Sequence, residues 1–305
     1  MHQFWHVGCY ITIGDLVALN PETTQVDTHS NMKLSIPGKS NLLCLMALAA
    51  AIPMMGYAGD DSKSTKATAA VAPAPEDPFV TGNLTINYET HFISYGQDVW
   101  GIGSSWDTWF VHPSLELDFN ITKNLQFYLN LWADVNDQAD TNIGKYVQEI
   151  DVNVGFYYTL DKFKFQLGYG AWNYASQTES VIEGRVTYTD PWNLSPFIAL
   201  HGRVGIGSNI GFDDGLVTQF GLSPSKTWGA LTLSLPITVS FDTHNYHGGD
   251  AGFAYVSAGL SASYAINKHF ALNLGATYYH TDSSTIPGNP KEDFVTGLAG
   301  FTVSF

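Results

Sequence analysis

Residues 107–131, DTWFVHPSLELDFNITKNLQFYLNL, decide the expected fold. From Trp109 to Ile121 the odd positions carry apolar residues, while almost every even position is polar. After Thr122-Lys123 the alternation starts again and runs to Leu131. A period of two places successive side chains on opposite faces, so each half predicts a strand with one apolar and one polar face. The two residues between the halves predict a tight turn that joins antiparallel neighbours.

The same period continues to the end of the chain and predicts further strands. We expect strands at 80–95, 107–121, 124–134, 146–160, 162–174, 180–189, 195–207, 215–223, 229–241, 253–265, 269–281 and 293–305. Short connections alternate with long ones, as in bacterial barrels with short periplasmic turns and longer outer loops. We therefore predict an all-β fold, a transmembrane antiparallel up-and-down β-barrel of 12 strands. A β-sandwich is the alternative, but it has no reason to keep strands this long or connections that alternate in length.

Composition agrees with strands that lie between two different solvents. Charged residues make up 13% of the 305 residues, about half the share in a soluble domain, and the mean hydropathy is −0.03. Strands with one face toward lipid and one toward water have this combination of low charge and average hydropathy. The net charge is −15, and Arg185 and Arg203 are the only arginines. Nucleic-acid binding, which needs clustered basic residues, is therefore not expected.

The N-terminal residues have the pattern of an export signal. Lys33 and Lys39 are followed by an apolar segment at 42–55 and by small residues up to Ala58. We predict an over-extended start at 1–31, a signal peptide at 32–58, a disordered periplasmic leader at 59–79 and the barrel at 80–305. A genuine, unusual leader at 1–31 is the alternative. Cys9 and Cys44 precede the expected cleavage site, so the mature barrel has no thiol, and we expect no cofactor.

The last strand ends in an aromatic residue, Phe305, preceded by apolar or small residues at alternate positions. Such an end resembles the signal that the barrel-assembly machinery reads, so we expect that machinery as a partner. A barrel that follows an export signal is expected in a bacterial outer membrane. An even number of strands places both termini on the same side, which we expect to be the periplasm. Outer-membrane lipids and lipopolysaccharide are then further partners. The acidic outer loops either bind divalent cations shared with lipopolysaccharide or serve solubility.

The polar faces of the strands predict which side chains line the lumen. Charges on the lipid face cost about 2–4 kcal/mol at mid-membrane, so charged residues are expected on the inner face. Carboxylates gather on the early strands and the two arginines on later ones, which predicts a transverse field that filters ions. The alternative is a salt-bridged plug of Glu183, Arg185 and Arg203 that closes the lumen. The expected pore-lining residues are Glu89, Glu116, Asp118, Glu149, Asp151, Glu183, Arg185, His201 and Arg203.

These features favour a porin for passive diffusion of small hydrophilic solutes or ions through a narrow, charge-segregated lumen. A closed structural or adhesion barrel is the alternative, because twelve strands enclose a narrow bore. Single-channel conductance and liposome swelling distinguish the two.

Two short motifs contain residue types used in catalysis or metal binding. His112-Pro-Ser114 resembles the His-x-Ser pair of a twelve-stranded outer-membrane phospholipase family, but its parity places both side chains in the lumen, away from lipid. We therefore expect no enzyme activity. The segment 242–250, with His244 and His247 between aspartates, has ligand types suited to zinc. We interpret it as a solvated outer loop and expect no metal site.

Two stretches carry a family resemblance. Residues 80–96, VTGNLTINYETHFISYG, resemble the opening strand and first loop of the TorF-type putative porins, and residues 149–170, EIDVNVGFYYTLDKFKFQLGYG, resemble a strand, tight turn and return strand of that family. The likeness covers roughly residues 80–175. It departs at 93–95, where an Arg-Gly pair is expected. The resemblance implies a small outer-membrane porin barrel and names no solute.

Overall fold

The computed structural model describes residues 78–140, 143–205, 214–244 and 246–305. The over-extended start at 1–31, the signal peptide at 32–58 and nearly all of the leader at 59–79 lie outside these residues. Within the described part of the chain, no helix is long and apolar enough to cross a membrane.

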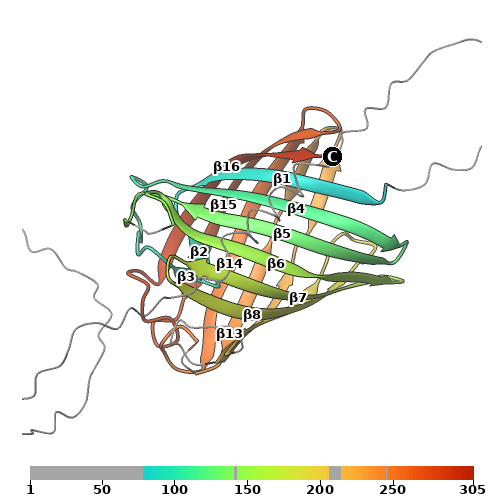
Figure 1. The fold of residues 1–305 in the computed structure, drawn as a ribbon. Helices are drawn as coiled ribbons and strands as arrows, with labels where there is room; N and C mark the ends of the chain where they lie inside the picture. Colours follow the sequence, from blue (N-terminus) through green and yellow to red (C-terminus); the bar gives the residue numbers. More distant parts are fainter. Residues whose placement is uncertain (1–77, 141–142, 206–213, 245) are drawn as a thin grey trace, which may run out of the picture. The chain divides into compact units, whose positions relative to one another are not determined.

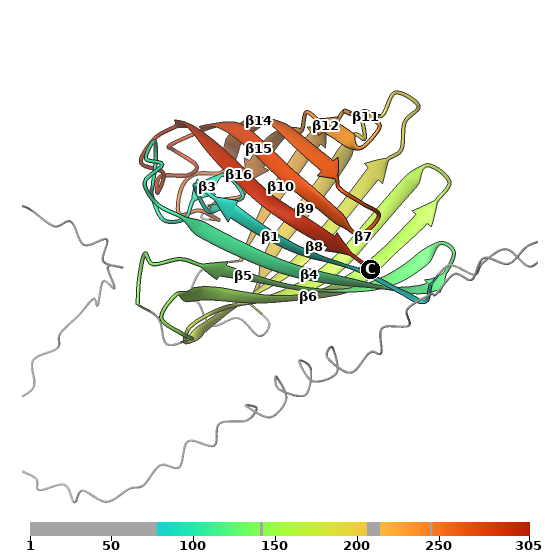
Figure 2. The ribbon, with the colours of Figure 1, turned by 90° about the horizontal axis from the view of Figure 1, so that it is seen from above.

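One antiparallel sheet closes on itself to form a barrel (Figures 1 and 2). Neighbouring strands follow chain order from β4 to β10, and β1 pairs with β16 to join the two ends of the chain. Closure is completed by β14, which pairs with β15. The strands of the barrel wall are β1 (Val80–Glu89), β4 (Phe110–Thr122), β5 (Leu125–Val135), β6 (Val147–Leu160), β7 (Phe163–Tyr174), β8 (Gln177–Tyr188), β9 (Phe197–Val204), β10 (Gly215–Leu222), β11 (Ser225–Trp228), β12 (Leu231–Ser234), β13 (Ile237–Asp242), β14 (Gly252–Ala265), β15 (Phe270–Thr281) and β16 (Asp293–Ser304).

Prolines interrupt two strands of the barrel wall. Pro224 separates β10 from β11, and Pro236 separates β12 from β13, because proline has no N–H to donate to a ladder. The pieces remain aligned: β11 pairs with β12, β10 pairs with β13, and the Leu235 N–H donates to the Pro224 carbonyl at 2.9 Å. Each pair of pieces therefore forms one wall strand, and the described wall has the twelve predicted strands.

The connections differ from the prediction in two places. The predicted turn at 225–228 is strand β11, and the chain instead turns after Trp228, where Gly229 has a φ of 60°. The predicted long loop at 175–179 is a two-residue turn, because β8 begins at Gln177. The connection from Tyr188 to Phe197, at the other end of the barrel, is longer. The strict alternation of short and long connections is therefore wrong at this hairpin.

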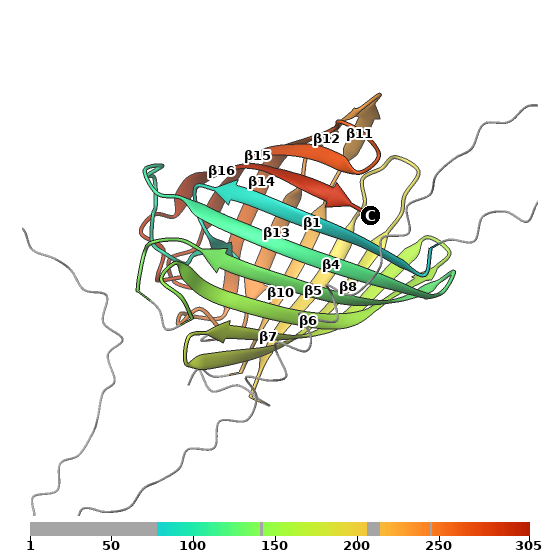
Figure 3. The ribbon, with the colours of Figure 1, turned by 45° about the horizontal axis from the view of Figure 1, so that its top comes forward.

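The first predicted strand, 80–95, was too long. Strand β1 ends at Glu89, and the chain then folds inward as a small hairpin of β2 (Ile93–Ser94) and β3 (Gln97–Asp98). Tyr95 and Gly96, with φ of 47° and 90°, form its two-residue turn, the backbone geometry favoured in tight hairpins. We call residues 91–98 the inner hairpin. Figure 1 labels its two strands, and Figure 3 shows β1 and β4, the wall strands that precede and follow it in the chain.

The two faces of the wall differ as the alternation predicted. Directly paired residues share a face, and Leu231 and Leu233 pair with Tyr264 and Ala262, while Thr232 pairs with Ser263. Large apolar side chains are exposed on the outer face, for example Leu167 at 62%. Glu116 pairs with Asn130 on the opposite, polar face. The barrel is therefore apolar outside and polar inside.

Candidate functional site

The tip of the inner hairpin is tied to the far wall of the barrel. The Tyr95 hydroxyl donates a hydrogen bond of 2.6 Å to Oε1 of Glu183 on β8. The Tyr95 ring stacks on His201 of β9, with 4.0 Å between ring centroids, and Tyr246 packs edge-on against both rings. Burial, and next the charge of Glu183, raise the pKa of Tyr95, so its hydroxyl keeps the proton that it donates.

The second half of the inner hairpin is hydrogen-bonded to the loop between β15 and β16. Asn289 donates from Nδ2 to the Gly96 carbonyl at 2.9 Å and accepts the Asp98 N–H at 2.8 Å. The Asp98 carboxylate accepts the Gly103 N–H at 2.7 Å, and His91 contacts the Gly103 carbonyl at 2.9 Å. The hairpin is thus held at both ends and forms a fixed part of the lumen.

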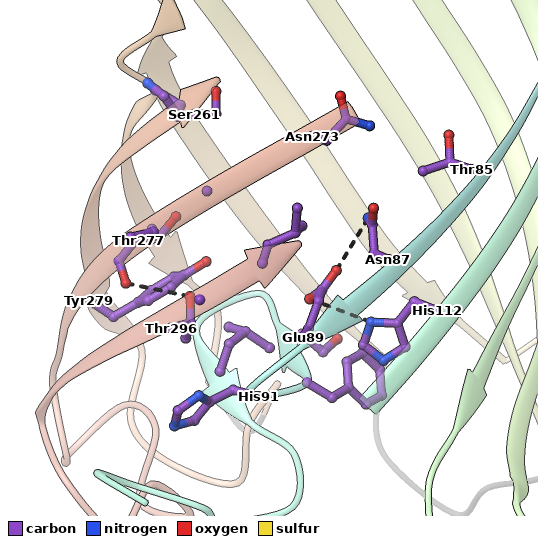
Figure 4. Close-up of a pocket in the computed structure, with 18 of the residues that line it drawn as sticks. Thr85, Asn87, Glu89, His91, His112, Ser261, Asn273, Thr277, Tyr279 and Thr296 are labelled. Carbon is purple, nitrogen blue, oxygen red and sulfur yellow. Dashed lines mark hydrogen bonds and ion pairs between the residues drawn. The ribbon is translucent and has the colours of Figure 1, made fainter. Parts of the chain in front are cut away.

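A large cavity lies against the inner hairpin. It measures about 780 Å³ and is bounded by the inner hairpin and by the inner faces of β1, of β4 to β7, and of β12, β14, β15 and β16 (Figure 4). A second cavity of about 270 Å³ is lined by Tyr246 and His247 of the loop after β13 and by Glu179 and Arg203. Residues common to both cavities are Phe92, Ser94, Glu149 and Trp172. These four side chains therefore mark the junction between the cavities.

The walls of the large cavity differ in charge. Its carboxylates are Glu89, Glu149 and Asp151, from β1 and β6. The lining contributed by β12, β14, β15 and β16 is neutral, with hydroxyl and amide groups. Figure 4 shows part of this lining, with Ser261, Asn273 and Thr277 on β14 and β15. The described lining of this cavity contains no lysine or arginine.

His112 on β4 joins two carboxylates. Its ring nitrogens lie 3.4 Å from Glu89 and 3.2 Å from Asp134, and the His112 side chain is only 4% exposed. Ser114 accepts a hydrogen bond from Asn130. His112 therefore pairs with two carboxylates, and Ser114 pairs with Asn130. The two side chains do not form the hydrogen-bonded pair of a nucleophile and its general base.

The two arginines have separate partners. Arg203 donates from Nε to Glu179 at 2.6 Å and from a terminal nitrogen to the Tyr246 carbonyl at 3.0 Å. The Arg185 guanidinium lies 3.7 Å from the centroid of the Phe197 ring. Glu183 pairs with His201 at 3.0 Å. The three-residue plug of Glu183, Arg185 and Arg203 is therefore wrong as a description, and the inner hairpin occupies this part of the lumen.

The remaining predicted lumen residues lie on the inner face but at different depths. Glu89, Glu149 and Asp151 line the large cavity. Glu116 and Asp118 lie on the inner face of β4, where both interact electrostatically with Lys164 of β7. They line neither cavity, because they lie nearer the end of the barrel where β1 begins and β16 ends.

The histidine-containing loop at 242–250 forms two separate pairs. His247 contacts Asp242 at 2.6 Å, and both side chains are buried, whereas His244 and Asp250 are exposed and 4.0 Å apart. Within the described residues, no group of three or more metal-ligating side chains occurs. The prediction of a fully solvated loop was wrong for Tyr246 and His247, which fold against Arg203 and the hairpin tip.

Sequence reasoning missed the residues that hold the inner hairpin, which are Tyr95, Tyr246 and Asn289. Tyr95-Gly96 carried a signal, since glycine at the second position of a two-residue turn favours a hairpin. The aromatic and β-branched residues of 92–95 instead suggested continuation of the first strand. Nothing in the local sequence marks Asn289, because its partners in the inner hairpin lie almost 200 residues away.

Comparisons with known proteins add a likeness of architecture. No protein family and no curated protein matches the sequence, so membership of the TorF-type family stays a prediction. Among solved structures, the NanC porin has 10% identity and a TM-score of 0.45, over 73% of this chain and 98% of its own. The KdgM porin, in complex with disordered oligogalacturonate, has 8% identity and a TM-score of 0.44, over 73% and 99%. The COG4313 outer membrane channel from Pseudomonas putida F1 has 9% identity and a TM-score of 0.48, over 76% and 99%.

Proposed function

We propose that this protein is an outer-membrane porin that lets small hydrophilic solutes or ions diffuse through a narrow, charge-segregated lumen. The observation that carries the proposal is the closed barrel, apolar outside and polar inside, with a cavity of about 780 Å³ in its lumen. An apolar band on the outside needs lipid around it, and a polar lumen needs water. No transported solute is implied by the fold itself.

The chain ends fit insertion from the periplasm. The Gly82 N–H donates to the Phe305 carbonyl at 2.8 Å, so β1 starts where β16 ends. With a signal peptide at 32–58, both termini of the mature barrel would lie in the periplasm. The aromatic Phe305 would then be available to the barrel-assembly machinery, and the outer rim to lipopolysaccharide.

The distribution of charge supports ion selectivity. Carboxylates line the large cavity on the side of β1 and β6, while Arg185 and Arg203 lie on β8 and β9. Opposed charges across a narrow lumen create a field that orders dipolar solutes. The balance in the large cavity is acidic, so cations are expected to pass more readily than anions.

A closed structural barrel remains the second candidate, because the inner hairpin occupies the lumen and is fixed by hydrogen bonds to Glu183 and Asn289. In this case the two cavities are separate pockets.

Planar bilayer recordings distinguish the two candidates. Purified protein should give discrete conductance steps, with a reversal potential in a KCl gradient that indicates cation preference. Silence at all voltages, from protein whose folding is established by a difference in gel migration between unheated and heated samples, would refute the porin proposal and favour the closed barrel.

A further inference from the structure

Asp151 on β6 lies between two indole rings. In the register of the wall it pairs with Trp132 of β5 on one side and with Trp172 of β7 on the other. Directly opposite residues have Cβ atoms about 4.5–5.5 Å apart, so the three side chains form one row across the inner face. All three line the large cavity.

Within the described residues, no cationic side chain forms an ion pair with Asp151. Its side chain is 7% exposed, and within the described residues its Oδ1 has no hydrogen-bond partner. Its charged neighbours are the carboxylates Glu149, Glu179 and Glu183. Arg203 is paired with Glu179 and His201 with Glu183, and no ion pair in the described part of the chain reaches Asp151 or Glu149. An unpaired buried charge is costly, and a bound cation would remove that cost.

Glu149 brings a second carboxylate to the same place. It precedes Asp151 by two residues on β6, so both side chains face inward, and they interact with each other. Glu149 is 4% exposed and, like Trp172, lines both cavities. A solute that moves from one cavity to the other therefore passes beside this carboxylate and this indole.

The mixture of groups favours an organic cation over a metal ion. Calcium takes six to eight oxygen ligands, and the described residues contain no group of three or more metal-ligating side chains. Aromatic faces attract ammonium groups through their negative ring surface, and tryptophan is the strongest of them. A volume of about 780 Å³ is within the range of small-molecule sites.

We propose that Asp151, Glu149, Trp132 and Trp172 form a binding site for a small organic cation, an amine or a quaternary ammonium compound, at the junction of the two cavities. The carboxylates supply the charge, and the indoles, which also pack against His201 and His112, supply aromatic surface beside them. This inference deepens the proposed porin function by naming the class of solute that the lumen selects, but the binding site itself does not require an open channel.

Binding to the purified full-length barrel in detergent tests the proposal. Choline chloride is titrated at constant ionic strength and neutral pH, with heat of binding and tryptophan fluorescence as the two readouts. The matched probe is 3,3-dimethyl-1-butanol, which has the shape of choline without its charge. We expect saturable binding of choline and no saturable binding of the neutral probe. Equal behaviour of the two probes would overturn the proposal.

Substitutions then locate the site. Asp151→Asn should weaken choline binding by about tenfold or more, because removing one partner of a desolvated charged contact is costly. Trp132→Leu should weaken it by a smaller factor and serves as a second variant if Asp151→Asn does not fold. Asp161→Asn is the matched control, since Asp161 is exposed in the turn between β6 and β7 and its positive φ suits asparagine. Unchanged affinity in both Asp151→Asn and Trp132→Leu would show that choline binds elsewhere and would refute the site.

Parallel bilayer recordings separate the failure of this inference from the failure of the porin proposal. Choline binding by a barrel that gives no current would support the binding site and refute the porin proposal. Potassium current through a barrel that does not bind choline would support the porin proposal and refute the binding site. If both hold, choline added to a potassium solution should reduce the potassium current, and Asp151→Asn should remove that block.

Discussion

Tyr95 and Glu183 are 88 positions apart in the chain, yet a hydrogen bond of 2.6 Å joins the hydroxyl of one to the carboxylate of the other across the lumen. One residue is the tip of a loop, and the other is on the barrel wall. The bond fixes the inner hairpin where the two cavities meet. If the barrel is a channel, this contact controls how wide the channel is.

Removing the Tyr95 hydroxyl should loosen the hairpin. A hydrogen bond to a charged group contributes about 1.5–3 kcal/mol, so in Tyr95→Phe the hairpin should leave its closed position more often. We expect a larger mean conductance and more open-channel noise in planar bilayers. Tyr88→Phe is the matched control, because Tyr88 is half exposed on the outer face of β1. Identical traces for native protein and Tyr95→Phe would show that the hairpin does not limit the current.

Gly96 should tolerate no side chain. A Cβ atom there would lie 2.3 Å from Cδ1 of Tyr255, and its φ of 90° is strained for any other residue. Gly96→Ala should therefore displace the inner hairpin and expose it to protease at the 90–106 loop. Gly184→Ala is the control, since the nearest atom to its Cβ would be 4.0 Å away. Equal protease resistance of the two variants would contradict the placement of the hairpin.

His112 should be important for stability, because it lies between Glu89 and Asp134. Breaking a buried ion pair by removing one partner costs about 3–5 kcal/mol, since the remaining charge has no partner. His112→Leu should lower the free energy of unfolding in urea by an amount of this order. His244→Leu, at an exposed loop position, should change it little. A small effect at both positions would indicate that the pair of carboxylates is neutral when folded.

The turn after β8 should be sensitive to acid. Burial alone would raise the pKa of Asp190, but the N–H groups of Ser195 and Trp192, at 2.6 and 2.8 Å, lower it. A lowered folded-state pKa stabilises the fold above the unfolded value of about 3.9. That stabilisation is lost as the pH falls through the folded pKa. Thermal unfolding of the native barrel followed by circular dichroism should show this loss, and Asp190→Asn should show a smaller dependence in the same range.

The alternation of residues was enough to predict the barrel. The positions that alternate in 107–131 became β4 and β5, with the turn one residue later than predicted, at Lys123-Asn124, and the apolar residues Leu231 and Leu233 face outward as expected. A period of two is a local property, because each side chain needs only its own lipid or water. For the same reason the sequence placed Glu89, Glu149 and Asp151 on the inner face.

The site depended on contacts that no local pattern contains. The loop after β1 resembles a strand in sequence, and only the tertiary structure shows that it folds back to meet Glu183, Tyr255 and Asn289. The alternative of a plug placed Arg203 with Glu183, yet Arg203 pairs with Glu179. The arginine side chain is long enough to reach more than one carboxylate, so strand pairing alone does not determine its partner. The sequence by itself determined which side chains face the lumen. Which of them meet there was decided by the closure of the sheet, since residues far apart in the chain come together only when the barrel is formed.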